Sequence, residues 1–451
     1  DTILNIFPDL EIRKDILNGD DELKLIGGKF STLRHLSDAM RKVQQGEYSS
    51  LSPIWKKAEN WYEENEKPRL QSIKKGLNFD NRAKPLDKEF TDLFFKNDYM
   101  GDKTLSPSRL EKYSHCPFSY FISYALKPDE LRKFEVAGRE IGDIYHACIM
   151  QVTRKLTEDN LWHTVSDEEC RELLRKAVEL ETRGYRGGLF EFGKEEGYKK
   201  KRIEETCMKS LRVLIYHIRE GKVKDSKFEV KFGKGRSIEP ITVIMPSGEK
   251  VYIEGAIDRL DYLENDRVKI IDYKSGNLNL NIDEIEAGYR LQLMLYVTAA
   301  QEGVRKPAGM FYFHIHSPRL KDLYGEGSEE FEASVKNEII RSFKLDGIMI
   351  NDEETVDAIA GDFDKKSKIV DVNVNRNGEL KGKALISEEA FQMLQDTVVS
   401  KVTELIEDME KGNIDIFPMR VKDSTTCDYC EFKGICRFDL GFKGCEYNDV
   451  K

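Results

Sequence analysis

Two short apolar segments, each containing a late aspartate, constrain the fold of this chain more than any other feature. They read IEGAIDRLDYL (253–263) and VKIIDYKSG (268–276), and the ENDR between them is typical of a tight turn. If Asn265 lies at the tip, a symmetric hairpin pairs Asp258 directly with Asp272. Facing like charges destabilise a hairpin. The pattern therefore predicts either an ordinary surface hairpin or a site where a cation lies between two carboxylates.

The apolar runs favour the cation site. Asp258 and Asp272 both follow nearly continuous apolar sequence, which is typical of buried strands, and buried charges need partners. Carboxylate oxygens completed by water suit Mg²⁺, with Mn²⁺ as an alternative. Lys274 is two residues beyond Asp272, so both side chains project from one face of the strand, with Tyr273 on the other. A lysine there can stabilise charge on a phosphate or help to deprotonate water.

The remaining sequence alternates between helical and strand-like patterns. Residues 1–103 carry apolar residues at three- and four-residue spacing, and a looser stretch rich in Asp, Asn, Lys and Gly ends this region. From 104 onward, helical patterns continue to about Gly221, and strands, a helix and a further strand follow, a succession typical of an α/β domain. We therefore expect a helical segment over 1–103 and an α/β domain over 104–451.

Several polar residues are candidates for the same site. Gln292 and Tyr296 share one face of an expected helix, where a plain helix–sheet contact is equally compatible. His146 lies in an apolar helix, and a lone helical histidine is more often structural than a ligand. Glu229 fits a solvent-facing strand position better than a ligand position. We expect His314 and His316 to lie at the surface or in a substrate groove.

Three cysteines near the end of the sequence, in CDYCEFKGIC, have the spacing of a metal or cluster site. Cys427, Cys430 and Cys436 need a fourth ligand, which Cys445 or a distant cysteine such as Cys116 could supply. Zinc and iron–sulfur both fit this chemistry. The other cysteines lie in helical patterns and have the character of small core residues, namely Cys148, Cys170 and Cys207.

The composition excludes several classes of protein. Eight cysteines in 451 residues are too sparse for a secreted disulfide scaffold and indicate a reducing compartment. The sequence has no apolar run of membrane-spanning length and no signal-peptide pattern at its start, so we expect no membrane association. A net charge of −10 argues against nucleic-acid binding over the whole surface. It leaves room for a local basic channel, for which YKKKR (198–202) is one candidate.

Six motifs in a fixed order resemble a known family. They are LSPSRLEKYSHCPFSYF, GREIGDIYH, EGAIDRLD, IIDYKSG, LQLMLY and CDYCEFKGICRFD. Together they resemble the nuclease domain of the RecB-type branch of the PD-(D/E)XK superfamily, most closely that of AddB-type subunits of bacterial AddAB helicase–nucleases. The resemblance covers about Leu105 to Leu440. It implies a restriction-endonuclease-like α/β core, a mixed sheet flanked by helices, preceded by the tail of a helicase-like region.

The resemblance also implies roles for individual residues. The family's catalytic positions correspond to His146, Asp258, Asp272 and Lys274, with Gln292 and Tyr296 as the helix motif. In this assignment His146, Asp258 and Asp272 hold Mg²⁺. The family further implies a 4Fe–4S cluster, with the ligands Cys116, Cys427, Cys430 and Cys436.

The implied activity is Mg²⁺-dependent hydrolysis of single-stranded DNA, namely the 5′-ended strand released from an unwound duplex, during double-strand-break processing and recombinational repair. The implied partners are DNA and an AddA-type helicase–nuclease subunit, in the bacterial cytoplasm. AddB-type subunits are longer and begin with a helicase-like domain. We therefore expect this sequence, which starts at Asp1, to be a fragment.

Three other functions fit parts of the pattern. A non-catalytic DNA-binding module would use the hairpin only as structure, and a zinc-stapled interaction domain would use the cysteines for zinc. Among enzymes, a short RecB-type exonuclease of the CRISPR-adaptation kind also carries four cysteines. The long helical insertions between the motifs disfavour this last alternative.

Overall fold

The computed structural model describes residues 20–78, 82–98, 101–128, 138–185, 188–191, 194–276, 278–318, 329–441 and 444–450. The chain forms two compact units, Asp1–Ala83 with Lys433–Tyr447, and Lys84–Phe432 with Asn448–Lys451. This division comes earlier than the boundary expected near residue 103. The reason is that the intervening segment packs on the larger unit, where Leu86 N–H donates to the Gly412 carbonyl (2.8 Å) and Arg109 donates to the Phe94 carbonyl (2.7 Å).

The first unit is helical, as its spacing of apolar residues predicts. Its elements are η1 (Asp20–Leu25), α2 (Lys29–Gln44), α3 (Pro53–Asn65), α4 (Lys67–Leu77) and α16 (Lys433–Cys436). Leu36, Trp55, Tyr62 and Leu70 form a buried core among α2, α3 and α4. Ser52 caps α3 by accepting a hydrogen bond from Trp55 N–H, and Pro53 occupies the first helical position.

The larger unit contains one main sheet and many helices. The helices are α5 (Lys88–Thr91), η2 (Asp92–Phe94), α6 (Pro107–His115), α7 (Pro117–Tyr120), η3 (Phe121–Leu126), α8 (Gly138–Glu158), α9 (Asp167–Thr182), η5 (Leu189–Glu191), α10 (Lys194–Glu220), η6 (Glu264–Asp266), α11 (Ile282–Glu286), α12 (Gln292–Gln301), α13 (Glu329–Ser342), α14 (Glu353–Ala360) and α15 (Glu388–Glu410). Across the described residues, none of the chain's helices is both long and apolar enough to cross a membrane.

The strands of this unit form one six-stranded sheet and smaller sheets. They are β1 (Lys96–Asn97), β2 (Lys103–Leu105), β3 (Val223–Phe232), β4 (Ile241–Ile244), β5 (Lys250–Ile253), β6 (Gly255–Leu263), β7 (Arg267–Lys274), β8 (Lys306–His314), β9 (Asp346–Ile350), β10 (Asn373–Val374), β11 (Leu380–Lys381), β12 (Leu385–Ile386), β13 (Met419–Val421), β14 (Ser424–Thr425) and β15 (Asn448–Val450). The main sheet has the order β12-β9-β8-β7-β6-β3.

The main sheet is mixed, as the family resemblance implies. β3, β6 and β7 pair antiparallel, β7 and β8 pair parallel, and the connection between β7 and β8 runs through α11 and α12. A parallel pair needs such a crossover, whereas the antiparallel β6–β7 pair needs only the short turn η6. β7 and β8 lie in the middle of the sheet, which explains their nearly unbroken burial.

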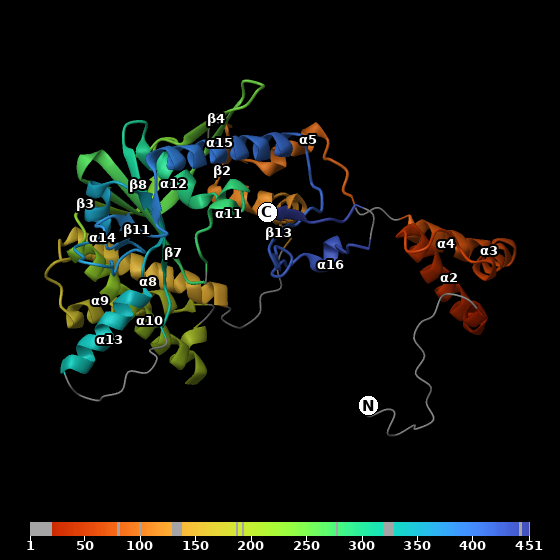
Figure 1. Ribbon diagram of the computed structural model, residues 1–451, viewed down its shortest axis with the longest axis horizontal. Helices are drawn as coiled ribbons and strands as arrows, with labels where there is room; N and C mark the ends of the chain where they lie inside the picture. Colours follow the sequence, from red (N-terminus) through yellow and green to blue (C-terminus); the bar gives the residue numbers. More distant parts are fainter. Residues whose placement is uncertain are drawn as a thin grey trace. The chain divides into compact units, whose positions relative to one another are not determined.

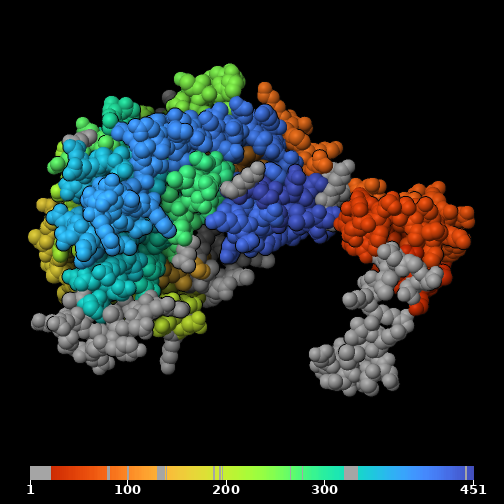
Figure 2. Space-filling model, in the orientation of Figure 1, coloured from red at the N-terminus to blue at the C-terminus, as the bar shows by residue number. Residues whose placement is uncertain are grey.

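Helices cover both faces of the main sheet (Figure 1). α12 and α15 lie on one side, and α8, α9 and α10 lie on the other. In the space-filling view, α15 runs across the face of the larger unit (Figure 2). The main hydrophobic core is formed by α8, α9 and α10 packing on β7 and β8, with Ile271, Tyr273 and Phe313 among its buried residues. This arrangement places β7, which carries Asp272, in the middle of the sheet, with β6 beside it.

Candidate active site

The β6–β7 hairpin has the register that the sequence predicts. Arg259 pairs with Ile271, and Tyr262 pairs with Val268, which is the register that sets Asp258 opposite Asp272. η6 forms the tip at Glu264–Asp266. Asp272 is only 1% exposed because β7 is a central strand. The two carboxylates thus lie on neighbouring buried strands of the same hairpin.

Asp258 is held by groups from two elements. Its Oδ2 accepts a hydrogen bond from the backbone N–H of Tyr273 (3.0 Å), and Nε2 of His146 in α8 lies 3.0 Å from the same oxygen. The His146 ring also packs edge-on against the Tyr273 ring, with centroids 5.9 Å apart. Burial by itself lowers the pKa of His146, but the contact with Asp258 outweighs it and raises that pKa. The structure therefore brings His146 to Asp258.

Lys274 connects the hairpin to α12. Its Nζ lies 2.7 Å from Asp272 Oδ2 and donates a hydrogen bond of 2.9 Å to Gln292 Oε1. The amide nitrogen of Gln292 in turn donates to the hydroxyl of Tyr296, at 2.7 Å. Burial lowers the pKa of Lys274, but the Asp272 carboxylate outweighs this effect, so the pKa is raised and the side chain keeps its proton. Asp272, Lys274, Gln292 and Tyr296 therefore form one continuous chain of polar contacts.

Glu111 belongs to this site although its sequence context does not single it out. Its Oε1 accepts hydrogen bonds from the backbone N–H groups of Leu291 (2.7 Å) and Gln292 (2.9 Å), at the start of α12. A carboxylate at a helix N-terminus satisfies amide groups that have no partner within the helix. Burial raises the pKa of Glu111, while these two amide hydrogen bonds oppose the rise. Glu111 therefore fixes the position at which Gln292 meets Lys274.

Burial and neighbouring carboxylates disfavour the charged form of Asp272. Burial raises its pKa to about 7, Lys274 opposes this rise, and Asp258 and Glu111 add to it. Asp272 Oδ2 is buried, and no hydrogen bond of ordinary geometry reaches it within the described residues, although Lys274 Nζ is close. A divalent cation between Asp258 and Asp272 would satisfy this oxygen and offset the repulsion.

The side chains are not already gathered around a metal position. Within the described ranges, no group of three or more His, Cys, Asp or Glu side chains stands close enough together to hold a metal ion. Asp258 is in contact with His146, and Asp272 is in contact with Lys274. The donor types nevertheless fit a hard cation, since two carboxylates and an imidazole lie within one small region.

Other candidates lie apart from this chain of contacts. Glu229 of β3 is in an ion pair with Arg154 of α8, and its side chain is 45% exposed, in keeping with the solvent-facing position expected for it. His314 ends β8, and its Nδ1 lies 3.1 Å from a backbone carbonyl of the segment after β7. His316 follows the strand and stacks on Phe343, with ring centroids 4.3 Å apart. His316 Nδ1 also lies 3.2 Å from the carbonyl oxygen of His314, so the two histidines are neighbours whose rings meet different partners.

The lysines of YKKKR are paired with carboxylates along α10. Lys199 lies 3.2 Å from Glu195 and Lys201 lies 4.0 Å from Glu205, while Lys200 pairs with a glutamate of α9. These pairs compensate much of the positive charge that made this segment a candidate for a basic channel.

A buried ionic cluster lies on the hairpin face opposite Asp272. Arg259 donates two hydrogen bonds to Asp261 (2.7 and 2.9 Å), and Lys269 on the paired strand lies 2.8 Å from the same carboxylate. Ser226 of β3 donates a further bond of 2.7 Å. Burial raises the pKa of Asp261, but the two cations outweigh it and lower the pKa to about 2. The cluster links β3, β6 and β7 in one register.

Three of the cysteines predicted as cluster ligands lie in the larger unit. Cys116 stands between α6 and α7, and Thr426, next to Cys427, donates a hydrogen bond of 3.1 Å to the carbonyl of the residue before Cys116. Burial raises the pKa of the Cys116 thiol, nearby backbone N–H groups oppose the rise, and the neighbouring Cys430 adds to it. Amide groups directed at a sulfur are typical of cluster ligands.

The fourth predicted ligand, Cys436, ends α16, which belongs to the first unit. Its Sγ lies 3.9 Å from the carbonyl of Lys433, within the same short helix. Cys445, the alternative ligand, also belongs to that unit and is buried. The complete ligand set remains a prediction.

A mixed sheet flanked by helices, with a hairpin that carries two aspartates and a lysine, defines a class of nucleases. The sequence profile of the PD-(D/E)XK nuclease superfamily matches residues 104–437, and the chain belongs to this superfamily. A second profile, for the fifth domain of the ATP-dependent helicase/deoxyribonuclease AddB, matches residues 18–76. Both the expected fold and the resemblance to AddB-type subunits are confirmed.

Three relatives of this chain are subunits of ATP-dependent helicase/deoxyribonucleases. The protein from Clostridium perfringens strain 13 is 31% identical over 447 residues, which cover 96% of this chain and 38% of the relative. Those from Clostridium tetani (30% identical over 463 residues, 99% and 39%) and Alkaliphilus metalliredigens (28% over 467 residues, 100% and 40%) are similar. The chain thus spans about two fifths of the length of these relatives.

Proposed function

We propose that this chain hydrolyses phosphodiester bonds of DNA with the help of Mg²⁺, for which Mn²⁺ could substitute. The observation that carries the proposal is the register of the hairpin, which sets Asp258 opposite Asp272 and places Lys274 beside Asp272. Membership of a nuclease superfamily and the name deoxyribonuclease of the relatives support it. A non-catalytic hairpin would have no need of two facing carboxylates, one of them, Asp272, fully buried.

Each residue has a definite task in this proposal. Asp258 and Asp272, together with His146, would hold the cation, which supplies Lewis-acid stabilisation of the charge that develops on the phosphate. Lys274 carries a proton and directs Nζ toward the carboxylate that faces the substrate, so it can donate to a phosphate oxygen or orient the attacking water. Gln292 and Tyr296 hold Lys274 in this orientation. Gln292 accepts a hydrogen bond from Lys274, and Tyr296 accepts one from Gln292.

The proposed substrate is a single DNA strand, the 5′-ended strand released by an unwinding partner. The partner would be an AddA-type helicase–nuclease subunit, in the bacterial cytoplasm, and the reaction would serve double-strand-break processing and recombinational repair. The match of residues 18–76 to an AddB domain and the helicase/deoxyribonuclease names of the relatives support this assignment. Contacts to such a strand should be mostly electrostatic and sensitive to salt.

We further propose that the chain carries a 4Fe–4S cluster held by Cys116, Cys427, Cys430 and Cys436. The spacing of the last three cysteines and the packing of the Cys427–Cys430 segment beside Cys116 support this set. Cys170, which is buried in α9, provides a matched control. We expect Cys116→Ala to lose iron and visible absorption and Cys170→Ala to keep both. A colourless wild-type protein that contains zinc and no iron would exclude the cluster.

The proposed activity is tested by substituting one carboxylate without changing its shape. We expect Asp272→Asn to reduce Mg²⁺-dependent degradation of a single-stranded oligonucleotide by at least about a hundredfold. Asp396→Asn, an exposed substitution on α15, should degrade the strand like the wild type. Equal activity of the Asp272→Asn protein and the wild type would refute the mechanism.

A further inference from the structure

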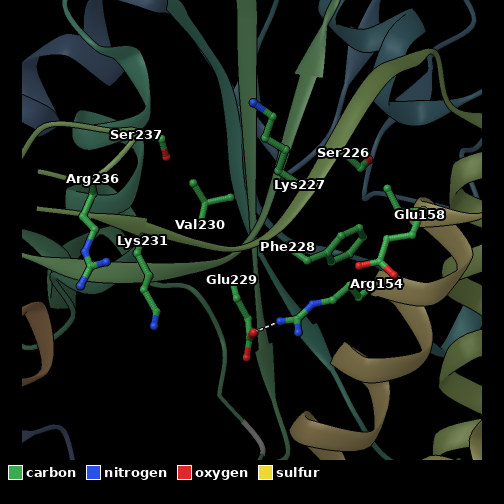
Figure 3. Close-up of a pocket in the computed structure, with 11 residues that line it drawn as sticks. Arg154, Glu158, Ser226, Lys227, Phe228, Glu229, Val230, Lys231, Arg236 and Ser237 are labelled. Atoms are coloured by element: carbon green, nitrogen blue, oxygen red, sulfur yellow. Dashed lines mark hydrogen bonds and ion pairs between the residues drawn. The ribbon is translucent and has the colours of Figure 1, made fainter.

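A groove between α8 and β3 lies in the larger unit and has a volume of about 500 Å³. Figure 3 shows Lys231, Arg236 and Arg154 around Glu229 on one side of β3, with Lys227 extending from the other side. Phe228 and Val230 are the apolar residues that line the groove. The residues that line the groove take no part in the polar contacts from Asp272 to Tyr296.

The groove is positively charged on a chain whose net charge is −10. Its basic side chains outnumber its carboxylates, the four basic residues being Arg154, Lys227, Lys231 and Arg236 and the two acidic ones Glu158 and Glu229. Among the described residues, Arg154 pairs with Glu229, but no carboxylate lies within 4.0 Å of Lys231 or Arg236. This contrasts with the lysines of YKKKR, which all have carboxylate partners. Uncompensated cations in a groove attract anions.

The groove is next to the catalytic hairpin. On β3, Phe228 pairs with Arg259 and Val230 pairs with Ile257, so Glu229 lies opposite Asp258 on the adjacent strand. The other wall is α8, which carries both His146 and Arg154. These two residues are about 12 Å apart along the axis at 1.5 Å per residue. A strand with its scissile phosphate at Asp258 would therefore bring flanking phosphates to the groove.

Glu229 has an unusual backbone for a residue inside a strand. Its φ is +49°, in the left-handed region, although the register of β3 with β6 is the same on both sides of it. Such a conformation is costly for a residue other than glycine and concentrates at functional sites. Its carboxylate reaches Arg154 beside the two uncompensated cations (Figure 3). The Glu229 carboxylate thus occupies the position at which these cations would bind an external anion.

We propose that this groove binds a backbone phosphate of the DNA strand that flanks the scissile bond. This inference rests on the proposed nuclease function and extends its substrate site. Lys231 and Arg236 contact the phosphate, and Arg154 joins them when the phosphate displaces the Glu229 carboxylate. The contacts are to the backbone, so they carry no base preference and weaken as salt rises.

The test measures binding of a fluorescent single-stranded oligonucleotide in EDTA, where metal-dependent cleavage cannot occur. We expect Lys231→Gln/Arg236→Gln to raise the Kd by about tenfold and to reduce the slope of log Kd against log salt by about 1 to 2. The matched control Lys199→Gln/Lys201→Gln removes the same charge from α10 and should leave the Kd near the wild-type value. Equal weakening of both double variants would show that only net charge matters and would overturn the proposal.

Glu229→Gln gives a readout of opposite sign, which misfolding cannot produce. Removing the competing carboxylate should lower the Kd by about threefold. An unchanged or raised Kd would overturn the proposal that the phosphate displaces the Glu229 carboxylate. Failure of the nuclease proposal would give a different result. The wild-type protein would still bind DNA in EDTA but would not cleave it when Mg²⁺ is added.

Discussion

The carboxylate of Glu111 in α6 accepts a hydrogen bond of 2.9 Å from the backbone N–H of Gln292, the first residue of α12. The side chain of the same glutamine accepts a hydrogen bond from Lys274. Glu111 therefore connects the helix that ends next to Cys116 with the helix whose Gln292 contacts Lys274. It touches none of the groups that would meet the substrate, so it is a positioning residue.

Glu111→Ala should lower cleavage while leaving most of the fold intact. The substitution leaves two amide groups at the start of α12 without an acceptor, at a cost of about 1 to 2 kcal/mol in the free energy of unfolding. We expect kcat to fall by about tenfold, which corresponds to about 1.4 kcal/mol in the activation barrier. Glu111→Gln keeps one oxygen acceptor and should lie between Glu111→Ala and the wild type. Wild-type kcat in Glu111→Ala, measured beside the exposed control Glu404→Ala, would contradict the role.

Tyr296 should act on catalysis only through Gln292. We expect Tyr296→Phe to reduce kcat several-fold and Gln292→Ala to reduce it further, because Gln292 contacts Lys274 directly. In a double-mutant cycle, the combined variant should be no slower than Gln292→Ala alone. If the effects of the two substitutions on the activation free energy were additive, Tyr296 would act independently of Gln292.

Asp261→Ala should destabilise the protein strongly. It would leave Arg259 and Lys269 as uncompensated buried charges, and breaking such a cluster costs about 3 to 5 kcal/mol. Urea denaturation measures this loss, and Asp396→Ala on the surface should change the free energy of unfolding by less than about 0.5 kcal/mol. Adding Lys269→Met to Asp261→Ala should restore part of the loss, and no recovery would count against the charge explanation.

His217 should make the fold sensitive to acid. Burial lowers its pKa to about 3, and Lys269 and Arg259 act in the same direction. In the unfolded chain its pKa is about 6.5. Between these values the unfolded state binds one more proton. The free energy of unfolding should therefore fall as pH decreases through this window, by up to about 1.4 kcal/mol per pH unit.

Chemical denaturation at several pH values checks this expectation. His217→Leu should flatten the fall in stability between about pH 6.5 and about pH 4, while the exposed control His163→Asn should keep it. The same slope in the wild type and His217→Leu would assign the acid sensitivity to other groups.

Local features of this fold could be predicted from the sequence. Alternation and a turn of fixed length determine which residues face each other in a hairpin, so the pairing of β6 and β7 followed from counting outward from Asn265. The start of α6 at Ser106 and Pro107 is a local feature of the same kind, since helix capping depends on neighbouring residues.

Contacts between distant segments could not be predicted in this way. Nothing in the sequence around Glu111 indicates that it meets the start of α12, because that contact depends on how two helices pack. Arg259 and Lys269 read as ordinary strand residues until the sheet buries them around Asp261. The sequence likewise gives no sign that the backbone of Glu229 adopts a left-handed conformation. In each case tertiary packing decides the outcome.

The two edges of the main sheet also bear on how the protein behaves at high concentration. An open strand edge invites strands of other molecules to add to it, which leads to aggregation. Here β12 has only two residues, Leu385 and Ile386. β3 exposes Lys224, Lys227 and Lys231, and the backbone turn at Glu229 interrupts its extended form. Both edges therefore present poor templates for intermolecular pairing, and the charges that line the groove also help the folded chains to stay apart.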